Sequence, residues 1–256
     1  MDSLFDVRGK VALVTGGTSG IGRMIATALV RRGVATYITG RDADRSRAVA
    51  AELGEHGTCI GLAADLEDRE APHRLAAELA GREPRLDILV NNAGIGGSGP
   101  LDTVAVADWD RVLSVNLRAA FFLVQQLLPQ LRAAATERGP ARVINVGSIG
   151  GLHVPNWEAF AYGASKAALH HVTRSLCKRL GSEGITVNAI APGPFPSRMT
   201  DTRSEAVGNS VRTYIPLGRA GEAEDVQGAV VFLASRAGAY VNGTVLPLEG
   251  GYLAAL

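Results

Sequence analysis

Short apolar runs and longer segments of mixed polarity alternate along the whole chain. The runs have the length and composition of buried strands, and they lie at residues 11–15, 35–39, 59–63, 86–90, 142–146, 186–190 and 244–248. The segments between them can hold helices, notably 104–135, 159–180 and 222–234. This alternation predicts an α/β fold in which about seven parallel strands form a doubly wound sheet with helices on both faces.

The carboxyl ends of the predicted strands should lie along one edge of the sheet, because right-handed crossovers return each strand in the same direction. Ligands bind at that edge, near the point where the strand order reverses. Most of the unusual residues of this sequence directly follow a strand, so we expect a site there. No linker, low-complexity run or internal repeat divides the sequence, and we predict one domain over residues 1–256.

Composition narrows the class of protein. The chain has 256 residues, 46% hydrophobic and 20% charged, and a formal net charge of +1, which gives no field that attracts nucleic acid or an acidic membrane. The histidines and the two distant cysteines show no metal-ligand spacing, and His170 and His171 are interpreted as exposed polar residues. With no secretion signal or membrane-length apolar run, we expect a cytoplasmic protein without a metal.

The first predicted strand is followed by a glycine-rich stretch, residues 15–22, and then by a helical pattern. A strand, a glycine-rich turn and a helix in this order form a phosphate cradle, because glycine lets the backbone turn tightly and approach a ligand. The free N–H groups of the first helical turn and the helix dipole favour an anion there. A tight turn without a ligand is the alternative at this point.

A possible proton-transfer pair lies in the predicted helix 159–180. Tyr162 and Lys166 are four residues apart and therefore share a face of that helix. An ammonium group near a phenol lowers the pKa of the phenol, and such a tyrosine can protonate a carbonyl oxygen or deprotonate an alcohol. The pair alone is more typical of an amphipathic helix with an exposed lysine.

Three further features favour chemistry at the same edge. Ser148 ends a predicted strand and could donate a hydrogen bond to the same carbonyl oxygen. Asn116 lies within the long helix 104–135, where its amide could bend the helix and hold a water, although a cap or a core amide would explain it as well. Residues 91–94 (Asn-Asn-Ala-Gly) follow the fourth strand, where small residues let a ring approach, or where asparagines simply stabilise a turn.

Taken together, these motifs resemble those of the short-chain dehydrogenase/reductases. The likeness covers residues 7–252 and rests on 15–22, 91–94, Asn116, Ser148, Tyr162-x-x-x-Lys166 and 192–193. Within that family the chain is most similar to bacterial 3-oxoacyl reductases of the rhamnolipid-pathway type, on stretches such as 128–132, 140–145, 160–162, 196–200 and 237–240. The resemblance implies a Rossmann-type fold and assembly as a homodimer or homotetramer.

The resemblance also implies a role for each matching position. Tyr162 would donate the proton, Lys166 would lower its pKa and bind the nicotinamide ribose, Ser148 would orient the substrate carbonyl, and Asn116 would hold the water that refills the proton. The implied cofactor-binding residues are Gly16, Thr18, Ser19, Gly20, Ile21, Gly22, Arg41, Asp65, Leu66, Asn92, Ala93, Gly94, Tyr162, Lys166, Pro192 and Gly193. Ser148 and Tyr162 are fourteen positions apart, one more than the commonest family spacing, which leaves the shape of the loop 150–161 open.

The end of the second strand bears on the choice of nicotinamide cofactor. An acidic residue there binds the ribose 2′-hydroxyl of NAD, whereas arginine accommodates the 2′-phosphate of NADP. In this chain Gly40 stands at the acidic position and Arg41 follows it. We therefore predict NADP(H), although Ser19 stands where many NADP-binding members have a basic residue, and Arg41 could instead be a solvated turn residue.

The substrate side is predicted from the loops. The segment at about 194–216 is long enough to be a lid. The apolar residues that we expect around the substrate, beside Ser148, are Leu152, Val154, Trp157, Phe195 and Met199. They suit an acyl chain, so we predict NADPH-dependent reduction of a small carbonyl substrate, a 3-oxoacyl thioester.

Two other functions are considered. The first is a polyol, sugar-acid or hydroxysteroid dehydrogenase on the same scaffold, which the fold alone does not exclude. The second is a nucleotide-binding regulator without turnover, which is disfavoured because all four catalytic positions of the family are filled.

Overall fold

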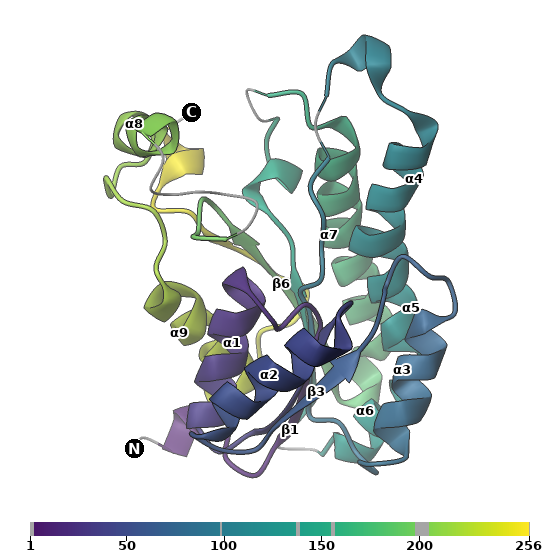
Figure 1. Ribbon diagram of the computed structural model, residues 1–256. Coiled ribbons are helices and arrows are strands. Elements are labelled where there is room, and N and C mark those ends of the chain that lie inside the picture. Colours follow the sequence, from purple (N-terminus) through teal and green to yellow (C-terminus); the bar gives the residue numbers. More distant parts are fainter. Residues whose placement is uncertain (1–2, 98, 137–138, 155–156, 198–204, 256) are drawn as a thin grey trace.

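The computed structural model describes residues 3–97, 99–136, 139–154, 157–197 and 205–255. At its centre lies one seven-stranded parallel sheet with the strand order β3-β2-β1-β4-β5-β6-β7 (Figure 1). The strands are β1 (Val11–Val14), β2 (Ala35–Gly40), β3 (Cys59–Ala63), β4 (Ile88–Asn91), β5 (Ala141–Val146), β6 (Ile185–Pro192) and β7 (Val245–Leu248). The predicted doubly wound sheet is confirmed, and its strand order reverses between β1 and β4, where such sheets bind ligands.

Both faces of the sheet are buried. Strands β1, β4, β5 and β6 are buried along their whole length. Successive side chains of a strand point to opposite faces, so Val14 and Val90 belong to one core cluster, and Leu13 and Leu89 belong to the other. Because side chains on both faces are buried, these strands appear in the sequence as continuous apolar runs.

Helices cover each face (Figure 1). The α-helices are α1 (Gly20–Arg31), α2 (Ala43–Gly54), α3 (Ala71–Ala80), α4 (Val106–Leu113), α5 (Ala119–Gln126), α6 (Leu128–Ala134), α7 (Phe160–Leu180), α8 (Glu205–Tyr214) and α9 (Ala223–Ala234). Helices α1, α2 and α9 pack on one face, and α3, α5, α6 and α7 on the other. Short 3₁₀ turns lie at Ser3–Phe5, Leu101–Thr103, Ile149–Gly151, Gly181–Glu183, Arg236–Gly238 and Tyr252–Ala254.

The segment predicted to be one helix, 104–135, is broken into several pieces. Helix α4 ends at Leu113, a π-helical stretch covers Ser114–Arg118, and α5 begins at Ala119. The expected bend at Asn116 therefore takes the form of a π turn, a feature found frequently at functional sites. Pro129 in the first turn of α6 separates α6 from α5, because proline cannot continue a preceding helix.

In the described part of the chain, no single helix is long and apolar enough to cross a membrane. One bent pair, Val106–Gln126 with Leu128–Ala134, passes that test by length and composition, with an angle of 58° between its two parts. Leu123, Leu127 and Leu131 of this pair are buried in the core against the sheet. No three described His, Cys, Asp or Glu side chains form a group that could hold a metal ion.

Candidate active site

A cavity of about 1410 Å³ opens along the carboxyl edge of the sheet. It is lined by residues that follow β1, β2, β3, β4, β5 and β6 in the sequence, as the position of the strand ends predicts. The predicted site residues in its wall are Gly16, Thr18, Ser19, Gly20, Ile21, Gly22, Arg41, Asp65, Leu66, Asn92, Ala93, Gly94, Ser148, Trp157, Tyr162, Lys166, Pro192, Gly193 and Phe195. The fold thus brings residues from six strand ends into one space.

The glycine-rich turn at one end of this cavity leaves no room for side chains. Gly16 and Gly20 have φ values of +64° and +53°, which favour glycine. A Cβ atom on Gly22 would lie 2.3 Å from Nδ2 of Asn92 and 2.4 Å from the carbonyl oxygen of Gly16. Helix α1 starts at Gly20, so the N–H groups of its first turn lie beside the cavity. The turn therefore has the form of an anion cradle.

Asn92 fastens this turn to the end of β4. Its Nδ2 donates to the carbonyl oxygens of Thr15 at 2.8 Å and Gly16 at 3.2 Å. In return, the hydroxyl oxygen of Thr15 accepts the backbone N–H groups of Asn92 and Ala93, each at 3.0 Å. These four bonds join the ends of β1 and β4 where the strand order reverses.

The end of β2 is shaped to exclude an acidic side chain. A Cβ atom on Gly40 would lie 2.9 Å from both Oγ of Ser46 and Cγ2 of Thr18, so no carboxylate fits there. Arg41 and Arg45 both line the cavity beside it. Arg45 was missed in the sequence, although its spacing of four residues from Arg41 was a usable signal. Two guanidinium groups at this end favour an anionic ligand group.

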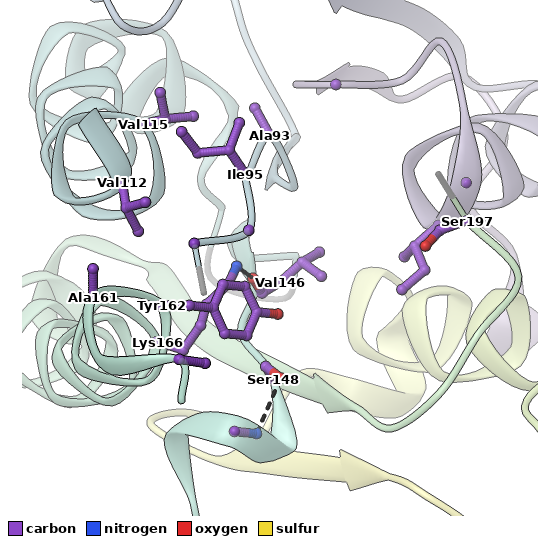
Figure 2. Close-up of a pocket in the computed structure, with 18 of the residues that line it drawn as sticks. Ala93, Ile95, Val112, Val115, Val146, Ser148, Ala161, Tyr162, Lys166 and Ser197 are labelled. Carbon is purple, nitrogen blue, oxygen red and sulfur yellow. Dashed lines mark hydrogen bonds between the residues drawn. The ribbon is translucent and has the colours of Figure 1, made fainter. Parts of the chain in front are cut away.

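The predicted proton-transfer pair also lies in the wall of this cavity. Tyr162 and Lys166 share a face of α7, and Nζ of Lys166 is 5.8 Å from the centroid of the Tyr162 ring. Figure 2 shows Tyr162, Lys166 and Ser148 close together, at the ends of β5 and α7. Nζ of Lys166 donates to the carbonyl oxygen of Val146 at 2.8 Å, and Oγ of Ser148 accepts the N–H of Gly150 at 3.0 Å.

Burial dominates the electrostatics of this pair. It raises the pKa of Tyr162 above its ordinary value of 10.0, and the Ser148 hydroxyl lowers it by a smaller amount. Burial also lowers the pKa of Lys166 to about 8. The expected lowering of the Tyr162 pKa by Lys166 is not found in this structure, where desolvation of the phenolate is the main influence and only the Ser148 hydroxyl acts against it.

Asn116 lies behind the cavity wall instead of lining it. Its Oδ1 accepts the N–H of Ile95 at 2.8 Å, and its Nδ2 donates to the carbonyl oxygen of Ile95 at 3.0 Å and to Oγ of Ser165 at 3.0 Å. Ser165 in turn donates to the carbonyl oxygen of Tyr162 at 2.7 Å. The amide thus connects the loop after β4 with the helix that bears Tyr162, and its water-holding role stays a prediction.

The expectation that His170 is exposed is wrong. The side chain is 2% exposed, one helical turn beyond Lys166, whereas its neighbour His171 is exposed. Its ring fills space that only glycine leaves open, because a Cβ atom on Gly147 would lie 2.0 Å from its Nε2 and one on Gly151 would lie 2.9 Å from its Cε1. Burial, and the charge of Lys166, lower the pKa of His170 to about 4, so it is uncharged at neutral pH.

The substrate side agrees only in part with the sequence-based expectation. Trp157 and Phe195 line the cavity, but Leu152 and Val154 do not, and their side chains are 42% and 89% exposed. Both residues follow the 3₁₀ turn Ile149–Gly151. Residues 198–204 of the predicted lid, which include Met199, lie outside the described residues. Helix α8, in the later part of the same lid, is described.

One apolar part of the wall was not predicted, and a second was predicted only in part, because the predicted lid 194–216 contains Val211 and Ile215. Ile95, Val112, Val115 and Ala161 line the side between α4 and α7, and Figure 2 shows them grouped beside Tyr162. Ile149, Val211, Ile215 and Tyr252 line the side towards α8. The helical spacing of Val112 and Val115 indicated a buried face, but nothing in it showed that the face borders a cavity.

Comparison with known proteins identifies the class. A family model described as enoyl-(acyl carrier protein) reductase matches residues 16–253. The rhamnolipids biosynthesis 3-oxoacyl-(acyl-carrier-protein) reductase of Pseudomonas aeruginosa is 43% identical over 254 residues, which are 98% of this chain and 99% of that protein. This chain belongs to the short-chain dehydrogenase/reductase family of oxidoreductases, as its motifs predict.

Solved and more distant relatives agree with this assignment. The Pseudomonas aeruginosa RhlG/NADP active-site complex has a TM-score of 0.94 at 43% identity, and the match covers 98% of this chain and 99% of that one. The 2-dehydro-3-deoxy-D-gluconate 5-dehydrogenase of Bacillus subtilis is 38% identical over 259 residues, which are 97% of this chain and 96% of that protein. The NADP in the solved relative confirms the predicted class of cofactor.

Replacing Gly22 by alanine is expected to raise the Kd for NADPH by about tenfold or more. The added methyl would lie 2.3 Å from Asn92, so the turn or Asn92 has to move and the anion cradle changes shape. Fluorescence titration of NADPH measures the effect. Gly228→Ala is the matched control, because no described atom lies within 4 Å of its Cβ position in α9. Equal Kd values for the two variants would show that the Gly22 contact does not matter.

Proposed function

We propose that this chain reduces the ketone of a 3-oxoacyl thioester to a secondary alcohol with NADPH. The observation that supports this most is the arrangement of one cavity. An anion cradle and two arginines share its wall with Tyr162, Lys166 and Ser148. The cavity is large enough for both a dinucleotide and a substrate.

The described residues fit a bound NADP(H). Gly16, Gly20 and Gly22 would hold the pyrophosphate, since their backbone is open to a close approach. Arg41 and Arg45 would hold the 2′-phosphate, and position 40 at the end of β2 carries no carboxylate that would repel it. Ala93 and Gly94 supply the small wall that a ribose or a ring needs, and Pro192 and Gly193 line the nicotinamide end.

When bound, the nicotinamide supplies the hydride that adds to the ketone carbon. Tyr162 donates its hydroxyl proton to the ketone oxygen, which becomes the alcohol. Oγ of Ser148 already accepts the Gly150 N–H, so its own hydrogen is left to bind the same ketone oxygen. The charge of Lys166 stabilises the phenolate that Tyr162 becomes, and the main chain near Asn116, loosened by the π turn, would hold the water that returns the proton.

The cavity wall favours an acyl chain as the remainder of the substrate. Apolar side chains line the cavity around Tyr162: Ile95 and Val112 lie beside it (Figure 2), and Ile149 and Ile215 also belong to the wall. A polyhydroxylated substrate would leave its hydroxyl groups without partners against such walls. The named function of the Pseudomonas relative supports the same choice, while the gluconate dehydrogenase relative keeps a sugar acid as the second candidate.

We further propose a homodimer or homotetramer in the cytoplasm. Phe121 and Phe122 on α5 form an edge-on pair with ring centroids 5.3 Å apart, and both are more than one third exposed in the single chain. Large apolar side chains grouped on a helix face suit a subunit interface. Cys59 and Cys177 are free thiols, which suits a reducing compartment.

Tyr162→Phe is expected to lower kcat for reduction of a 3-oxoacyl thioester by about a hundredfold or more, because the proton donor is lost. The Kd for NADPH should change by less than about threefold, since the ring is retained. Stopped-flow or steady-state NADPH oxidation measures kcat, and Tyr240→Phe at a fully exposed position is the control. Full activity of Tyr162→Phe would exclude the mechanism, and turnover of a sugar acid but no thioester would favour the second candidate.

Arg41→Asp is expected to raise the KM for NADPH by about tenfold or more, with a much smaller effect on NADH. The new carboxylate would repel the 2′-phosphate, which NADH lacks. Parallel measurements with both cofactors make the comparison. Arg47→Asp is the control, because Arg47 lies on α2, six residues after Arg41, and pairs with Asp44 outside the cavity. Equal changes for both cofactors in Arg41→Asp would refute the assignment.

The rate of ketone reduction is expected to fall as the pH rises through about 8, the lowered pKa of Lys166. Below this pH the ammonium is charged and stabilises the phenolate of Tyr162. Above it the amine is neutral, while Tyr162 with its raised pKa keeps its proton. A profile of kcat at saturating NADPH between about pH 6 and 10 tests this. A rate that stays level to the alkaline end would mean that the Lys166 charge is not needed.

A further inference from the structure

A small apolar cluster stands apart from the two main cores and borders the substrate end of the cavity. It consists of Ile149, Val211, Ile215 and Tyr252, which are each buried. Three distant segments supply them, namely the turn after Ser148, helix α8 with the residue that follows it, and the 3₁₀ turn Tyr252–Ala254. All four residues line the cavity, so any loosening of this cluster changes the wall beside the substrate.

The ring of Tyr252 lies between the other segments. The ring of His153 lies against it with centroids 5.0 Å apart and planes at 54°, and Tyr214 at the end of α8 meets it nearly edge-on at 6.5 Å and 75°. The backbone N–H of His153 donates to the carbonyl oxygen of Ile149 at 3.0 Å, so His153 is fixed to the turn that follows Ser148. One ring is thus shared by the Ser148 turn and by α8. Pairs of this kind stabilise beyond their buried area.

The C-terminal segment reaches this position through two glycines. Gly250 and Gly251 have φ values of +66° and +94°. A Cβ atom on Gly250 would lie 2.6 Å from Cγ2 of Ile215, and one on Gly251 would lie 3.0 Å from Cγ of Pro216. The N–H of Leu217 donates to the carbonyl oxygen of Gly250 at 3.1 Å. The segment before Tyr252 therefore packs directly against the chain that leaves α8.

We propose that Tyr252 is a positioning residue that holds helix α8 and the turn following Ser148 together, and so sets the affinity for the carbonyl substrate. Without its ring, Ile149 and Ile215 lose their common neighbour, and the apolar wall opens to water. Only the choice of carbonyl substrate rests on the proposed function, because the coupling of the two segments is independent of it.

Hydrogen exchange of the full chain with NADPH bound tests the coupling without a carbonyl substrate. Tyr252→Ala is expected to speed exchange about tenfold in residues 149–153 and 208–217, and to leave α7 unchanged. Tyr252→Phe should behave as the wild type, and Tyr252→Leu should change the same two segments by less. Tyr240→Ala, at a fully exposed tyrosine, is the control. Unchanged exchange of both segments in Tyr252→Ala and Tyr252→Leu would overturn the proposal.

Steady-state kinetics test the consequence for the substrate. In Tyr252→Ala the KM for a 3-oxoacyl thioester is expected to rise about tenfold, with kcat and the Kd for NADPH within about threefold of wild type. A fall of kcat with an unchanged KM would overturn the proposed role. If the wild type reduces no 3-oxoacyl thioester, the proposed function fails, and the exchange measurement still decides whether Tyr252 couples the two segments.

Discussion

The close approach of Asn92 to the glycine-rich turn is the contact on which the rest of the site depends. The backbone ladder between β1 and β4 ends with the bond from the N–H of Thr15 to the carbonyl oxygen of Val90 at 3.0 Å, and the segments beyond it need a further tie. Asn92 and Thr15 supply that tie through four hydrogen bonds. The Asn92 amide occupies the space where a side chain on Gly22 would lie. Glycine at position 22 therefore serves two purposes at once: it leaves room for the hydrogen bonds of Asn92, and it keeps the turn open to an anion.

A second constraint is that a single buried ammonium sits in the middle of the molecule. Lys166 donates to the carbonyl oxygen of Val146, a neutral partner, so its charge is not neutralised there by an ion pair among the described residues. A buried cation in such surroundings is costly, and its lowered pKa expresses that cost. The neighbouring His170 remains uncharged, so it adds no second charge to the same region. Lys166 thus carries, near the end of β5, a positive charge that is lost at a lower pH than an ordinary lysine would need.

How far the sequence predicts this molecule depends on the range of the interactions involved. The strands and the glycine-rich turn could be predicted because their patterns are local: runs of apolar residues such as 11–15, and glycines within a few positions of one another. The burial of His170 could not, because it depends on Gly147 and Gly151 in other elements leaving space for its ring. The outward direction of Val154 and the position of Tyr252 in the wall likewise depend on contacts between segments far apart in the chain.

The π-helical stretch Ser114–Arg118 sets the rotational phase between two helices. Each residue turns an α-helix by about 100°, so one additional residue in a turn rotates everything before it relative to everything after it by about that angle. Upstream, α4 can therefore present Val112 to the cavity, while downstream α5 presents Leu123 to the core on the sheet. A chain shortened by one residue within this stretch could keep the core or the cavity wall in place, but not both.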